Sequence, residues 1–112
     1  MPEEKKHVRE ELIQKLIENR VFWSYQKPEK NTISDDLVIE KTLEHLDIED
    51  IQQLFLLYPR EKIKQIWDER LIPDERYHSV NILFAYLYFD IKNPEQYLER
   101  KRQQHYKKLA AL

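Results

Sequence analysis

Four histidines are the first residues whose chemistry could build a site: His7, His45, His78 and His105. No two of them are four residues apart, the spacing that places two metal ligands on one helix face, and none belongs to a His-Glu-x-x-His pattern. The chain has no cysteine, which excludes a disulfide framework, a thiolate nucleophile and a cysteine-ligated zinc site. Ser34 and Ser79 precede apolar runs, so we expect them to cap helices rather than to act as nucleophiles. We therefore expect no catalytic residue, no metal site and no cofactor.

The absence of glycine from all 112 residues excludes several enzyme frameworks. Average usage of about 7% would give roughly eight glycines. Phosphate-binding loops, dinucleotide fingerprints and nucleophile elbows all need glycine. Tight Asn-Gly hairpin turns are excluded as well, which disfavours a β-rich fold. The composition therefore predicts a protein that is not an enzyme.

Composition and charge also set the broad class of the protein. Two tryptophans, seven tyrosines and four phenylalanines argue against disorder, and the net charge of −2 is unlike that of a polybasic nucleic-acid-binding protein. The longest nearly apolar stretch, residues 82–89, is far shorter than the ~20 residues that a membrane span needs. No apolar run follows residues 1–6, so we expect no signal peptide. These features predict a cytoplasmic protein with no membrane segment and a single helical domain over residues 1–112.

The spacing of the apolar residues predicts an all-α fold, a compact bundle of five or six short helices. We expect helices at about residues 3–20, 34–46, 48–58, 59–71, 79–91 and 94–110, with a loop at 24–33 that Phe22 and Trp23 anchor. A strand is the alternative for residues 79–91, because aromatic residues favour strands. The lack of turn residues on either side favours the helix. The predicted core consists of Leu12, Leu16, Leu43, Leu54, Ile63, Ile66, Trp67, Leu83, Phe84 and Leu87.

Two features of the second half of the chain are candidates for binding a partner. Residues 59–112 hold 11 Lys and Arg against 8 Asp and Glu, whereas residues 1–58 hold 8 against 13. The cations gather in a basic run, which consists of Arg100, Lys101, Arg102, Lys107 and Lys108. This run suits the carboxyl end of a helix, an acidic partner protein or nucleic-acid phosphate. Tyr86 and Phe89 belong either to a central helix covered on two sides or to an exposed strip that anchors a partner.

Several segments occur together in a distinctive order. The pair Phe22-Trp23 comes first, followed by Ile39-Glu40, which lies in a predicted helix. The next segments are the acidic residues 47–50, the run 58–67 and the segments 67–73 and 89–94. With these segments in this order, the chain resembles small bacterial proteins encoded just upstream of AbiEii-type nucleotidyltransferase toxins. The resemblance covers about residues 8–100. The resemblance implies an antitoxin or companion protein in a toxin–antitoxin or phage-defence module. It implies no catalytic residue.

The partner implied by the resemblance is a cognate nucleotidyltransferase-type toxin. Its candidate contacts in this chain are Tyr86, Phe89 and the basic run. A helix-turn-helix-like DNA-binding regulator is the alternative, with residues 48–58 and 59–71 as its two helices and Arg60, Lys62 and Lys64 near the start of the second. Residues 47–70 hold four Lys and Arg against six Asp and Glu, which disfavours phosphate contact and makes nucleic acid the less favoured partner. The sequence gives no prediction of the oligomeric state.

Overall fold

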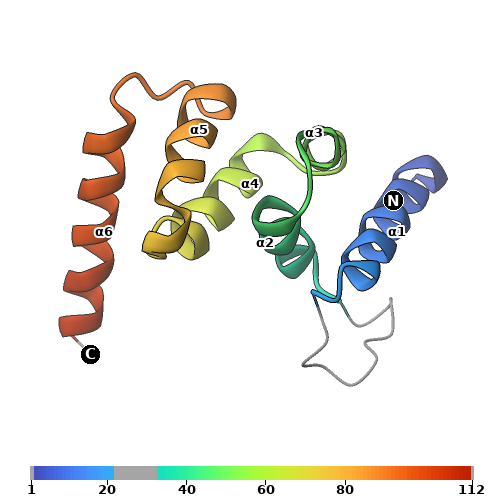
Figure 1. The fold of residues 1–112 in the computed structure, drawn as a ribbon, viewed down its shortest axis with the longest axis horizontal. Coiled ribbons are helices and arrows are strands. Elements are labelled where there is room, and N and C mark those ends of the chain that lie inside the picture. Colours follow the sequence, from blue (N-terminus) through green and yellow to red (C-terminus); the bar gives the residue numbers. More distant parts are fainter. Residues whose placement is uncertain (1, 22–32, 112) are drawn as a thin grey trace. The chain divides into compact units, whose positions relative to one another are not determined.

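The computed structural model describes residues 2–21 and 33–111, and within these ranges the chain is helical without any strand. The helices are α1 (Glu3–Glu18), α2 (Asp35–His45), α3 (Ile48–Leu57), α4 (Arg60–Ile66), α5 (His78–Tyr88) and α6 (Pro94–Ala110), as Figure 1 shows. A π-helical turn, η2 (Trp67–Leu71), and a 3-10 turn, η3 (Glu75–Tyr77), lie between α4 and α5. The prediction of an all-α fold with five or six short helices is thereby confirmed. None of these described helices has the length and apolarity that crossing a bilayer requires.

The chain divides into two compact units, Met1–Ile63 and Lys64–Leu112. The single domain expected over residues 1–112 therefore stays a prediction. The predicted loop at 24–33, apart from its last residue, lies outside the described residues, as do its expected anchors Phe22 and Trp23.

The first unit is built from α1, α2 and α3, each of which packs against the other two. Ser34 caps α2 as predicted, because its hydroxyl accepts a hydrogen bond from the Leu37 N–H at 3.2 Å. The predicted core residues of this unit are all buried, and they are joined by others of the same apolar kind. The buried apolar residues are Leu12, Ile13, Leu16, Ile33, Val38, Ile39, Leu43, Ile51, Leu54, Leu57, Tyr58 and Ile63.

The second unit is organised around Trp67, which is fully buried. The other buried apolar residues of this unit are Ile66, Leu71, Ile72, Phe84, Ala85, Phe89 and Leu98. The prediction that Leu83 and Leu87 belong to the core is wrong, since they are 46% and 53% exposed. One face of α5, with Asn81, Phe84 and Ala85, is covered by the unit, and the opposite face is left to solvent.

The chain between α4 and α5 departs from a regular α-helix. The helix predicted at 59–71 is α-helical only to Ile66, and the Ile72 N–H then donates to the Trp67 carbonyl at 3.1 Å, a π-type bond. The expected cap at Ser79 is also wrong, because α5 begins one residue earlier at His78. The chain approaches α5 through η3, where the Asp74 carboxylate accepts from the Arg76 N–H.

Two residues take the left-handed backbone conformation that glycine usually occupies. Arg20 follows α1 with φ 57°, and the Val21 N–H donates to the Leu16 carbonyl at 3.0 Å, as in a Schellman motif. Asp90 follows α5 with φ 51°, and there the Ile91 N–H donates to the Ala85 carbonyl at 3.0 Å. Because the chain has no glycine, these helix ends are made by residues for which the conformation is unfavourable.

Candidate functional site

The exposed face of α5 is the most apolar helix face that the described structure leaves uncovered. Its exposed apolar residues are Val80, Leu83, Tyr86 and Leu87, which we call the α5 strip. Tyr86 is the most exposed of the four, at 69%. No Asp, Glu, Lys or Arg occurs in α5, although charged residues make up 36% of the chain. Exposed apolar surface that no charge interrupts is typical of an interaction site.

Phe89 does not belong to the α5 strip: of the two alternatives for Tyr86 and Phe89, the exposed strip fits Tyr86 and the covered helix fits Phe89. It is 5% exposed, and its ring stacks on Trp67 with 4.7 Å between the ring centroids. On the other side Trp67 stacks on Tyr97 at 6.0 Å. The Trp67 indole N–H donates to the Asn81 side-chain oxygen at 3.0 Å, and the Asn81 amide donates to the Leu71 carbonyl at 3.1 Å. These contacts fix the buried face of α5 and thereby the orientation of the strip.

The first part of the basic run is engaged by the second unit itself. The Arg100 guanidinium lies over the Tyr97 ring at 5.4 Å, and the Lys101 ammonium lies 5.5 Å from the same ring and 3.9 Å from the Asp68 carboxylate. Arg102 is half-buried, and it donates to the Ile72 carbonyl at 3.3 Å and to the His78 ring. Arg102 therefore joins α6 to the start of α5, a structural role that the sequence analysis did not predict.

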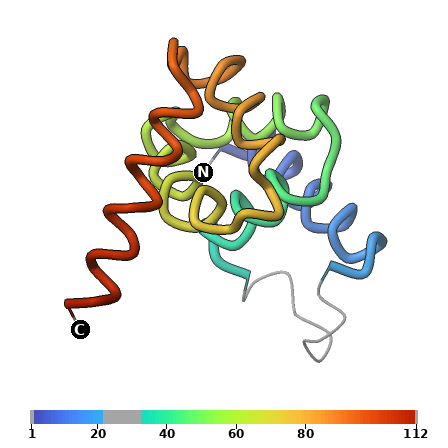
Figure 2. Tube along the Cα trace, turned by 60° about the vertical axis from the view of Figure 1, so that its left-hand side comes forward, coloured from blue at the N-terminus to red at the C-terminus, as the bar shows by residue number. Residues whose placement is uncertain are grey.

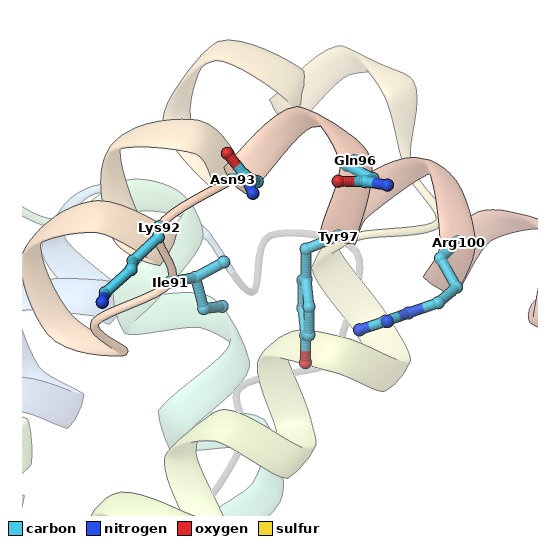
Figure 3. Close-up of a pocket in the computed structure, with 6 residues that line it drawn as sticks. All are labelled: Ile91, Lys92, Asn93, Gln96, Tyr97 and Arg100. Atoms are coloured by element: carbon cyan, nitrogen blue, oxygen red, sulfur yellow. The ribbon is translucent and has the colours of Figure 1, made fainter.

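A hollow of about 280 Å³ lies beside Arg100 at the start of α6. It is lined by Ile91, Lys92, Asn93, Gln96, Tyr97 and Arg100. Figure 3 shows Ile91 and the Tyr97 ring facing one another across it, with Arg100 extended toward the hydroxyl end of the ring. All six residues are exposed or half-buried, so the hollow is an open surface feature.

The second part of the basic run is exposed. Arg102 contacts the first residue of α5, and beyond it the residues 103–110, which we call the α6 tail, continue for about 12 Å at 1.5 Å per residue. In Figures 1 and 2 this part of α6 extends past the neighbouring end of α5. Lys107 and Lys108 lie here, and no ion pair involves either of them in the part of the chain that the structure describes. Tyr106 and Leu109 are about half exposed, and the sequence analysis did not include them among the candidate contacts.

The first unit contains a polar network that links its helices. The Arg9 guanidinium donates to the Asp35 carboxylate at 2.9 Å and to the Ile33 carbonyl at 2.6 Å, and the Tyr58 hydroxyl donates to Asp35 at 2.7 Å. Burial and the hydrogen bond to Asp35 raise the pKa of Tyr58 to about 12. Partial burial alone would raise the pKa of Asp35, but the hydrogen bonds from Tyr58 and Arg9 outweigh it and lower that pKa. This arrangement stabilises a charged carboxylate.

Replacing Asp35 by asparagine should lower the free energy of unfolding by about 1 kcal/mol at neutral pH. This is less than a buried hydrogen bond to a charged group contributes, because the Asp35 carboxylate is 44% exposed and solvent screens its charge. The pKa of Asp35 is lower in the folded chain than in the unfolded chain. The stabilisation that the charged Asp35 carboxylate gives the fold is therefore present above about pH 4 and is lost as the pH falls through the folded-state pKa. Denaturant unfolding of both proteins across this pH range measures the difference, which should shrink toward zero in acid. A difference that is the same at every pH would contradict the role of the charge.

Two of the three cations of the alternative DNA-binding interpretation lie beside carboxylates. The Lys62 ammonium lies 3.4 Å from the Asp36 carboxylate in the first unit. In the second unit, Lys64 lies 3.3 Å from Asp68 and donates to the Tyr97 hydroxyl at 2.7 Å. These contacts offset part of the positive charge that a phosphate backbone would meet there. Over the ranges 2–21 and 33–111, no group of three or more His, Asp or Glu is placed to hold a metal ion.

No family model matches this chain, and neither the curated proteins nor the solved structures contain a match.

Proposed function

We propose that this protein binds and neutralises a nucleotidyltransferase-type toxin through direct contact, as the antitoxin of a toxin–antitoxin or phage-defence module. The order of the segments that resemble such proteins supports the choice of partner. The α5 strip supports the mode of action, because it offers an apolar contact surface without any charged residue. Binding that covers or distorts a toxin needs a folded surface and no chemistry of its own.

The α5 strip, as the centre of the interface, is the observation that carries this proposal. Tyrosine is enriched among the residues that dominate binding energy, and Tyr86 is highly exposed on a helix whose other face is fixed by Trp67 and Asn81. Leu83 lies three residues before Tyr86 and Leu87 four residues after Leu83, so the three side chains share one face of α5. Exposed cations of α6 would contribute mainly to the rate of association and the choice of partner.

Co-expression with the product of the neighbouring gene in a host that lacks both genes tests the function. We expect the neighbouring product alone to arrest growth, and this protein to restore growth and to co-purify with it. If the neighbour is harmless alone, or equally toxic beside the folded protein, the antitoxin function is wrong. Rescue without an isolable complex would move the mechanism from protein contact to nucleic acid.

Replacing Tyr86 by alanine should weaken the complex by about 30-fold, corresponding to a hot-spot loss of about 2 kcal/mol. Calorimetric titration of the purified neighbouring product with wild-type and variant protein measures this change at low and at high salt. Leu56→Ala is the matched control, because Leu56 is 66% exposed on α3 of the other unit and should leave the affinity unchanged. Equal effects of Tyr86→Ala and Leu56→Ala would show that the α5 strip is not the contact surface.

A further inference from the structure

The α6 tail continues a helix face that is used for packing in the preceding turns. Along this face Leu98 is buried, and Arg102 and His105 are half-buried. The same face continues to Leu109 with Tyr106 beside it, both about half exposed, because α5 begins opposite Arg102. The tail thus carries an apolar stripe that nothing in the described chain covers.

The charges around this stripe are of one sign. Residues 100–111 contain five Lys and Arg and no Asp or Glu. Arg100, Lys101 and Arg102 are occupied by contacts within the second unit, whereas Lys107 and Lys108 are exposed, Lys107 about 100° around the helix from Tyr106 and Lys108 about 100° from Leu109. A surface that complements the tail must therefore combine an apolar floor with carboxylates beside it.

We propose that the α6 tail is a second docking element, which inserts into an acidic groove of a protein partner with Tyr106 and Leu109 as its apolar anchors. Lys107 and Lys108 pair with the carboxylates that line the groove. This inference rests on the proposed function, in which the partner is the toxin, and it adds a contact surface separate from the α5 strip.

A second copy of this chain does not suit the tail as an occupant. Residues 100–111 hold no Asp or Glu, so a second tail offers Lys107 and Lys108 no carboxylate to pair with. Helix-in-groove recognition by spaced apolar anchors needs only two or three turns of helix, which is the length that the tail provides.

The tail should also respond to binding in its dynamics. Among the described side chains of this two-turn tail only His105 is half-buried, and such a helical end is marginal in water because most helix stability comes from tertiary packing. Its amide hydrogens should therefore exchange rapidly in the free protein and become protected in the complex. Amides of α1 near Leu16, which is fully buried and lies outside both proposed contact surfaces, should change little.

The test is calorimetric titration of the purified neighbouring gene product with three forms of the full chain: wild type, Tyr106→Ala/Leu109→Ala and Lys107→Glu/Lys108→Glu. We expect each double variant to bind at least about tenfold more weakly, with the loss for the lysine variant larger at low salt. Hydrogen exchange of the same complex should show protection of residues 103–110. Because these side chains are exposed, circular dichroism should find both variants folded.

The outcomes separate this inference from the proposed function. If the wild-type chain does not bind the neighbouring product, the proposed function fails and the inference fails with it. If the wild type binds and both double variants bind equally well, the inference alone is overturned. A single-stranded RNA oligonucleotide is titrated in parallel, and RNA binding that Lys107→Glu/Lys108→Glu abolishes while the toxin affinity is unchanged would assign the tail to nucleic acid instead.

Discussion

Replacing Trp67 by alanine is expected to reduce the free energy of unfolding by about 3–5 kcal/mol, the usual cost of removing a large aromatic side chain from a core. Trp67 is fully buried, and its ring lies between those of Phe89 and Tyr97. The substitution leaves both rings without their stacking partner and removes a hydrogen bond to Asn81. A loss of this size is a large part of the 5–15 kcal/mol that stabilises a typical domain.

Chemical denaturation followed by circular dichroism measures the effect of Trp67→Ala. Leu56→Ala serves as the control, since trimming an exposed side chain should change the stability by less than about 0.5 kcal/mol. A loss below about 1 kcal/mol for Trp67→Ala would show that the aromatic stack does not hold the second unit together.

Replacing Asn81 by leucine should cost about 1–3 kcal/mol, although leucine is more apolar and the site is fully buried. The Asn81 side chain accepts from the Trp67 indole N–H and donates to the Leu71 carbonyl. Leucine leaves the indole N–H buried without a partner, whereas the Leu71 carbonyl keeps its bond from the Asp74 N–H at 3.0 Å. The expected loss therefore comes from one unsatisfied hydrogen-bond donor rather than from lost packing.

A double-mutant cycle with Trp67→Phe isolates this contribution. In the Trp67→Phe background the indole N–H is absent, so Asn81→Leu leaves no buried donor unpaired and should cost about 1–3 kcal/mol less. Denaturant unfolding of the four proteins gives the coupling energy. A coupling near zero would show that the bond between Trp67 and Asn81 contributes nothing to the fold.

The positions of the helices could be predicted because local signals specify them. Ser34 before an acidic pair marked the start of α2, and Asn93-Pro94 marked the start of α6. The π-helical turn at 67–71 was missed, because its extra residue is a response to packing around Trp67 and carries no sequence signature. It also explains how Trp67 and Ile72, five residues apart, are both fully buried.

The candidate site was predicted less well, for a reason that lies in α5. Nearly every residue of this helix is apolar, so its pattern has no polar face to indicate which side is solvent-exposed. Leu83 was therefore assigned to the core although it is exposed, and Phe89, which is buried, was included among the candidate contacts. The basic run was read from its charges alone, whereas the use of Arg102 within the fold depends on the antiparallel packing of α6 on α5.

The left-handed backbone conformation of Asp90 affects how much conformational entropy the chain would lose on binding a partner. Asp90 joins α5, which carries the strip, to the segment that leads into α6, which carries the tail. A glycine there would leave the hinge free to sample many directions, and binding would have to suppress them. Aspartate restricts the backbone before any partner arrives, and the bond from Ile91 to Ala85 closes the turn. The turn between α5 and α6 is thus preorganised, and the direction in which α6 leaves α5 is set by the fold itself.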